Sequence, residues 1–106
     1  MRPKDNWPEA RERALSRVRE LILSEIGDAP AAVYLIGSCA RGEAVTSSDI
    51  DVAIDPRPGF PRYLIAGIRE ALEESTIPYK VEVADLSVSG REFRERVMQG
   101  AVTWKA

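Results

Sequence analysis

The residues with the clearest chemical potential lie between positions 37 and 51, where a Gly-Ser pair is followed after ten residues by Asp-x-Asp. Alternate residues of a strand share a face, so Asp49 and Asp51 are expected to point to one side of a strand over 50–54. Neighbouring carboxylates repel each other unless a cation joins them, and Mg²⁺ takes oxygen ligands while keeping positions open for phosphates. Two such ions could clamp the attacking and leaving oxygens of a phosphoryl displacement. The alternative is that both aspartates lie on the solvent face of an edge strand.

The Gly-Ser pair follows the apolar segment 31–36, which indicates a buried strand. Gly37 suits a tight turn, and Ser38 is predicted to be the N-cap of a helix whose free N–H groups face a phosphate. Arg41, one turn later, would add positive charge. A P-loop has similar glycine spacing, but Glu43 and Ala44 stand where it needs lysine and serine or threonine, which excludes that motif. An ordinary serine-capped turn remains the alternative.

The periodicity of apolar residues predicts helices and strands in alternation. The arginines at positions 11, 13, 17 and 19 are expected on the exposed side of the first helix, and Phe93 and Val97 in the core under the last one. Strands separated by helices imply an α/β layer with the site along one edge of the sheet. The predicted helices are 8–26 (ended by Gly27), a short one after Ser38, 61–75 and 89–99; the predicted strands are 31–36, 50–54, 79–85 and, short, 101–104.

Composition indicates one globular domain over residues 1–106. The chain is 44% hydrophobic and 30% charged, which excludes disorder and a membrane span, and a net charge of −2 argues against general nucleic-acid binding. No partner role for a membrane or a nucleic acid is therefore expected. The lone Cys39 fits a reducing cytoplasm. Because the chain contains no histidine to activate it, Cys39 is expected to be inert packing.

This combination resembles the nucleotidyltransferase superfamily with the polymerase-beta-type core, and more closely the minimal nucleotidyltransferases. The resemblance runs from about residue 31 to the last helix. It implies an α/β (α+β) fold, with a small mixed sheet of three to four strands and helices packed mainly on one face. The matching positions are Gly37, Ser38, Ala40, Arg41, Gly42, Ser48, Asp49, Ile50 and Asp51.

The superfamily's active site uses a third acidic residue from a later strand, and segment 79–85 supplies two candidates. Glu82 lies on the face opposite Val81 and Val83, so it would share the side of the two aspartates if the valines enter the core. Asp85 has the parity of the valines and is expected to cap the next turn instead. We therefore favour Glu82, although the family commonly has aspartate there; a solvent-facing Glu82 is the alternative.

The resemblance also implies a function, namely that of a magnesium-dependent antitoxin that transfers AMP from ATP to a tyrosine of a HEPN-type ribonuclease toxin. Asp49, Asp51 and Glu82 would be the catalytic and metal-binding residues of a two-ion site. Gly37, Ser38 and Arg41 would hold the triphosphate of the substrate ATP. The oligomeric state, homo-oligomer or hetero-oligomer, is left open.

Two alternatives remain at this point. Glu82 departs from the family's aspartate by one methylene, which favours an antitoxin of weak catalysis that neutralises its toxin by binding it. The other alternative is an adenylyltransferase for a small molecule such as an aminoglycoside, which is disfavoured because the chain has no acceptor domain.

Overall fold

The sheet has four strands in the spatial order β3-β2-β1-β4. β1 is antiparallel to both β2 and β4, whereas β2 and β3 are parallel, so the predicted mixed sheet is confirmed. The computed structural model describes residues 7–106 without the side chain of Trp7; residues 1–6 of the predicted domain lie outside the described residues. The strands are β1 (Ala31–Ile36), β2 (Ile50–Pro56), β3 (Val81–Asp85) and β4 (Val102–Lys105).

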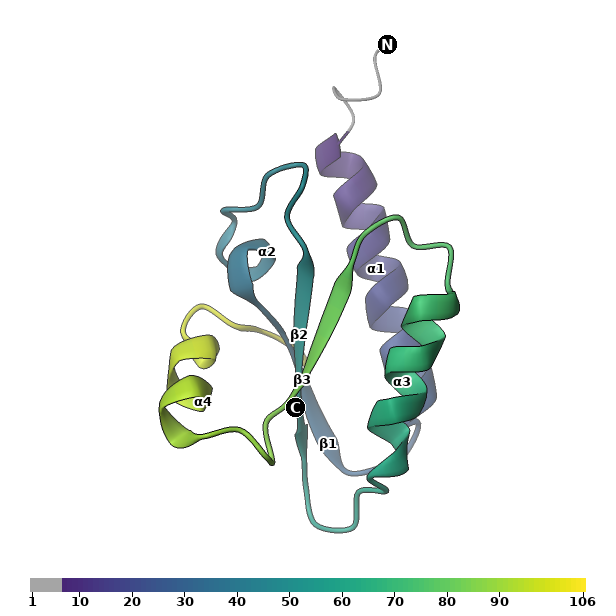
Figure 1. The fold of residues 1–106 in the computed structure, drawn as a ribbon, viewed down its shortest axis with the longest axis vertical. Helices are drawn as coiled ribbons and strands as arrows, with labels where there is room; N and C mark the ends of the chain where they lie inside the picture. The colour runs from purple at the N-terminus through teal and green to yellow at the C-terminus, as the bar shows by residue number, and fades with distance from the viewer. Residues whose placement is uncertain (1–6) are drawn as a thin grey trace.

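The two long helices, α1 (Trp7–Ile26) and α3 (Tyr63–Glu74), cover one face of the sheet (Figure 1). The main hydrophobic core lies between them and the sheet, where side chains such as Ile22, Val52 and Ile68 are fully buried. The shorter α2 (Gly37–Arg41) follows β1 at one end of the sheet, and α4 (Arg91–Met98) lies against the other face. The second face is therefore only partly covered, which leaves room for a site.

The first helix confirms its predicted boundaries to within one residue but contradicts one prediction about its polar side. Arg13, Arg17 and Arg19 are exposed, as expected, but Arg11 is only 4% exposed. Position 11 lies three residues before the buried Ala14, so it falls on the apolar stripe of the helix. Its guanidinium is buried because it binds backbone carbonyls of a neighbouring loop.

The last helix also differs from expectation. No residue of α4 is fully buried, and Phe93, predicted to enter the core, is 37% exposed. Val97 is half-buried and packs against a small cluster of Ile36, Ala53 and Leu86. The helix rests on the partly covered face of the sheet rather than between two layers, so its apolar side remains accessible.

Candidate active site

A cleft of about 580 Å³ opens on the partly covered face of the sheet. Gly37, Arg41, Asp51 and Glu82, four of the six predicted site residues, line it. We call this cavity the carboxylate cleft. The other two predicted residues, Ser38 and Asp49, do not line it. Its opposite wall is formed by three side chains of α4, namely Phe93, Arg96 and Val97.

Asp51 and Glu82 lie side by side because β2 and β3 are parallel and pair these two positions directly. Val52 and Val83 are buried on the opposite face, which turns the two carboxylates into the cleft. The prediction that Glu82 shares a side with Asp51 is therefore confirmed as geometry. Oε1 of Glu82 also lies 3.3 Å from the Lys80 ammonium, and both side chains are exposed.

The pKa of Asp51 is raised above the ordinary aspartate value. Burial is the largest cause, followed by the charges of Glu82 and Asp49, while the Arg41 guanidinium opposes the shift. A hydrogen bond between the side chains of Asp51 and Glu82 also raises it, since the protonated form of Asp51 can donate to its neighbour. The site thus concentrates negative charge that a cation would stabilise.

Gly37 is packed directly against Asp51. Its φ of +73° is a backbone conformation that residues with a side chain rarely adopt. A Cβ placed on Gly37 would lie 2.6 Å from Oδ2 of Asp51, well inside contact distance. The dihedral angle therefore favours glycine, and an added Cβ would force the Asp51 carboxylate to shift, which ties the Gly-Ser turn physically to the second aspartate of the motif.

The prediction that Ser38 is a helix N-cap is wrong. Helix α2 begins one residue earlier, at Gly37, and the cap position is occupied by Ile36 without a side-chain hydrogen bond. The turn is instead closed at its other end, where the Ser38 carbonyl accepts hydrogen bonds from the N–H groups of Gly42 and Glu43. Ser38 therefore lies inside the first turn of α2 rather than at its cap.

Arg41 lines the cleft but already has a partner. Its Nε donates to Oε1 of Glu43 at 2.9 Å, and both side chains remain substantially exposed. An exposed ion pair of this kind contributes little to stability, so the guanidinium can turn to an incoming phosphate at small cost.

Magnesium chemistry fits the donor types of the site, because the carboxylates of Asp49, Asp51 and Glu82 offer only oxygen ligands. Asp49 precedes β2 and is exposed, whereas Asp51 and Glu82 already adjoin each other. In the part of the chain that the structure describes, no three acidic, histidine or cysteine side chains converge tightly enough to mark a metal site. Asp49 is nonetheless close enough to Asp51 for its charge to raise the pKa of that carboxyl.

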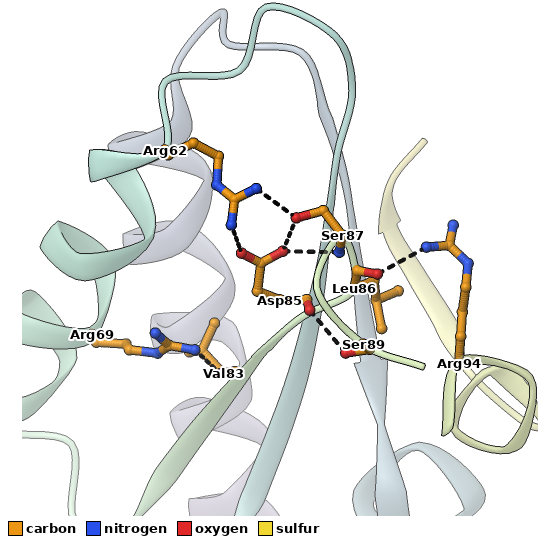
Figure 2. Close-up of polar contacts among 8 residues, drawn as sticks. All are labelled: Arg62, Arg69, Val83, Asp85, Leu86, Ser87, Ser89 and Arg94. Carbon is orange, nitrogen blue, oxygen red and sulfur yellow. Dashed lines mark hydrogen bonds and ion pairs between the residues drawn. The ribbon is translucent and has the colours of Figure 1, made fainter. Parts of the chain in front are cut away.

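Asp85 has a structural role, as the parity argument predicted. Its carboxylate accepts hydrogen bonds from the N–H and Oγ of Ser87, at 2.9 and 2.6 Å, and from Arg62 at 2.6 Å (Figure 2). It is 9% exposed and does not line the carboxylate cleft. These contacts fix the turn that leads from β3 toward α4.

The α4 wall of the cleft was missed by sequence reasoning. Arg94 fixes this helix by donating to the Leu86 carbonyl at 3.2 Å (Figure 2) and to Oδ2 of Asp55 at 2.6 Å. Arg96 instead lines the cleft, with its guanidinium 5.9 Å from the centre of the Phe93 ring. Phe93, Arg96 and Val97 lie at spacings of three and four, which place them on one side of the helix. This spacing was the available signal.

A second cavity, of about 600 Å³, lies between β3 and the end of α3. Of the predicted site residues only Glu82 reaches it, so it is not the centre of the predicted chemistry.

Within residues 7–106, no helix is both long and apolar enough to span a membrane.

Comparison with known proteins gives the family. Residues 21–104 match the family model described as Polymerase beta, Nucleotidyltransferase. A stretch of 63 residues is 32% identical to the Probable protein adenylyltransferase MntA of Haemophilus influenzae. This stretch covers 59% of the chain and 55% of the relative, so the chain spans little more than half the length of that curated protein.

Solved structures agree with the family model. One, described as a minimal nucleotidyltransferase, is 30% identical with a TM-score of 0.65, covering 85% of this chain and 92% of the other. A tri-AMPylated Shewanella oneidensis HEPN toxin in complex with MNT antitoxin also matches, with a TM-score of 0.62 over 88% of this chain and 70% of the other. At 17% identity this second likeness shows the fold alone. The chain belongs to the polymerase beta nucleotidyltransferase family and, within it, to the minimal nucleotidyltransferases.

Proposed function

We propose that this chain is a magnesium-dependent adenylyltransferase that transfers AMP from ATP to a tyrosine of a HEPN-type ribonuclease toxin, and so acts as its antitoxin. The observation that carries the proposal is the packing of Gly37, Asp51 and Glu82 around one cleft. The names of the relatives support the acceptor class, since one is a protein adenylyltransferase and another is bound to an AMPylated HEPN toxin. A related toxin–antitoxin structure contains the ATP analogue AMP-PNP, which supports ATP as the donor.

In the proposed reaction the tyrosine oxygen forms a bond to the α-phosphorus of ATP, and the bond from that phosphorus to pyrophosphate breaks. Glu82 would accept the hydroxyl proton; its position beside Asp51 in the lining of the cleft supports this role. Arg41 and the Gly37-Ser38 turn would bind the triphosphate. Mg²⁺ held by Asp49, Asp51 and Glu82 would neutralise the charge on the phosphates.

Labelled ATP gives the first test. The purified chain is incubated with the protein encoded by the neighbouring gene, the candidate toxin, together with Mg²⁺ and ATP labelled in the α-phosphate. We expect label on a toxin tyrosine and at least a hundredfold slower labelling with Asp51→Asn. Asp28→Asn, which removes an exposed carboxylate in the turn after α1, is the matched control. Silencing of the toxin without any label would favour the antitoxin that acts by binding alone, and label on an aminoglycoside instead of the toxin would favour the small-molecule enzyme.

The role of Glu82 has its own test. Glu82→Gln should slow AMP transfer at least a hundredfold, within the ~10²–10⁴-fold range of positioned acid–base groups, while ATP binding is largely retained. Glu82→Asp, which restores the family's common residue, should retain or improve transfer. Asp85→Asn should lower stability through the Arg62 and Ser87 contacts without this selective loss of rate. Transfer at the wild-type rate by folded Glu82→Gln would remove Glu82 from the mechanism.

A further inference from the structure

Arg11 is the buried cation of α1, and its guanidinium binds a loop far from it in sequence. Nη1 donates to the Ser48 carbonyl at 2.8 Å, and Nη2 donates to the carbonyls of Val45 at 2.6 Å and Thr46 at 3.1 Å. Nη1 also lies 3.3 Å from Sγ of Cys39. Three backbone carbonyls of the same turn therefore accept hydrogen bonds from one guanidinium, which holds the turn together.

The loop that Arg11 binds ends at Asp49, the residue directly before β2. It joins α2 to β2 and lies beside the N-terminal part of α1 (Figure 1). Its own hydrogen bonds are few: the Ser48 N–H donates to the Val45 carbonyl, and the Val45 N–H donates to the Ser48 hydroxyl, each at 2.9 Å. Cys39 joins the same group, because its Sγ lies 3.5 Å from the Asp49 carbonyl. The position of Asp49 thus depends on a turn with little regular structure of its own.

Arg11 also contacts the segment that leads to the third carboxylate. Its guanidinium carbon lies 4.5 Å from the centre of the Tyr79 ring, a cation–π distance. Tyr79 comes two residues before the start of β3, the strand that carries Glu82. One guanidinium therefore contacts α2, the 43–49 loop and the segment before β3, each of which carries or leads into predicted site residues.

We propose that Arg11 is a positioning residue, which holds the 43–49 loop and thereby sets Asp49 against Asp51 for nucleotidyl transfer. The catalytic part of this proposal rests on the proposed function. Lysine cannot replace Arg11, because an ammonium is a point charge whereas the planar guanidinium presents several donors in fixed directions. Arg11 does not line the carboxylate cleft, so nucleotide binding should survive its replacement better than the rate.

The experiment compares Arg11→Lys and Arg11→Met with Arg13→Lys, a matched change at an exposed position of the same helix. Amide hydrogen exchange is followed at Val45 and Ser48, whose N–H groups close the turn. We expect at least tenfold faster exchange at both amides with Arg11→Lys, unchanged exchange in β1 and β2, and no effect of Arg13→Lys.

Kinetics then separate positioning from folding. With Arg11→Lys, kcat for AMP transfer should fall tenfold to a hundredfold, as expected for a site misplaced by about 1 Å, while KM for ATP changes less than threefold. Arg11→Met should be slower still if it folds. Ser48→Ala, which removes the hydroxyl that accepts the Val45 N–H, should reproduce the kcat effect without altering Arg11.

Two outcomes would overturn the proposal: unchanged exchange at Val45 and Ser48 in folded Arg11→Lys, or faster exchange with an unchanged kcat. A wild-type chain that transfers no AMP would contradict the proposed function instead. In that case the exchange measurement still decides whether Arg11 holds the loop.

Discussion

Gly37 and Asp51 form a single packed unit, so a methyl group on the glycine should disturb the carboxylate. We expect Gly37→Ala to abolish most AMP transfer and to lower the melting temperature. Gly42→Ala is a sharp control, because Gly42 has the same φ of +73° but no atom within 4 Å of the added Cβ. Both variants carry the left-handed strain of roughly 1–2 kcal/mol, about 4–16 °C for a domain of this size.

Only Gly37→Ala adds the clash with Oδ2 of Asp51. Its melting temperature should therefore be lower than that of Gly42→Ala, as measured by calorimetry, and its activity should be selectively lost. Equal melting temperatures and equal activities of the two variants would show that the contact with Asp51 is unimportant.

The raised pKa of Asp51 predicts a pH-dependent effect on stability. Because the fold prefers protonated Asp51, the stability gained from this group is complete at pH values below the ordinary aspartate pKa and is lost as pH rises through the raised pKa. At pH 7 in chelator, Asp51→Asn should therefore melt a few degrees higher than wild type. The difference should shrink toward pH 4, and Asp28→Asn should show no such trend. A lower melting temperature for Asp51→Asn at pH 7 would contradict the prediction.

At the scale of elements, hydrophobic periodicity predicted every strand and the three longer helices, with ends within about two residues. It could not predict that Arg11 is buried or that Phe93 is accessible. Both depend on what lies opposite the helix: carbonyls of a distant loop accept the Arg11 charge, and a cleft leaves Phe93 uncovered. The same limit applies to Ser38, because the apolar pattern does not show that α2 begins at Gly37 rather than after Ser38.

The contacts of Arg94 with Asp55 and the Leu86 carbonyl should contribute more to stability than a surface ion pair on the same helix. Arg94→Gln removes the partner of Asp55, a side chain only 14% exposed, and releases the Leu86 carbonyl. We expect a loss of about 1–3 kcal/mol, roughly 4 °C or more in melting temperature, and weaker ATP binding because the α4 wall loosens.

Arg91→Gln is the matched control for Arg94→Gln. Arg91 pairs with Glu95 at 3.2 Å, but both side chains are highly exposed, so its loss should shift the melting temperature by less than about 2 °C. Thermal melts of both variants at one pH make the comparison. Equal shifts would mean that α4 is held mainly by apolar contacts.

For the molecule as a whole, ligand binding should raise the stability of the folded chain. Mg²⁺ with ATP should raise the melting temperature by mass action, which contributes about 2.7 kcal/mol at a hundredfold excess over Kd. Asp51→Asn should lose most of the part that depends on magnesium. Sodium chloride at matched ionic strength separates this effect from charge screening. Equal ATP affinity with and without magnesium, measured by calorimetry, would contradict the metal site.

The order of the strands has a consequence for how the chain folds while it is being synthesised. β1 has β2 on one side, but its other side is covered only by β4, which begins 66 positions after β1 ends. At roughly 5–20 residues per second, synthesis of that stretch takes about 3–13 s. During this interval a strand containing the apolar Val33 and Leu35 has an unpaired edge, which is a template for association between nascent chains. Translation speed across residues 37–105 should therefore influence how much of this protein escapes aggregation in the cell.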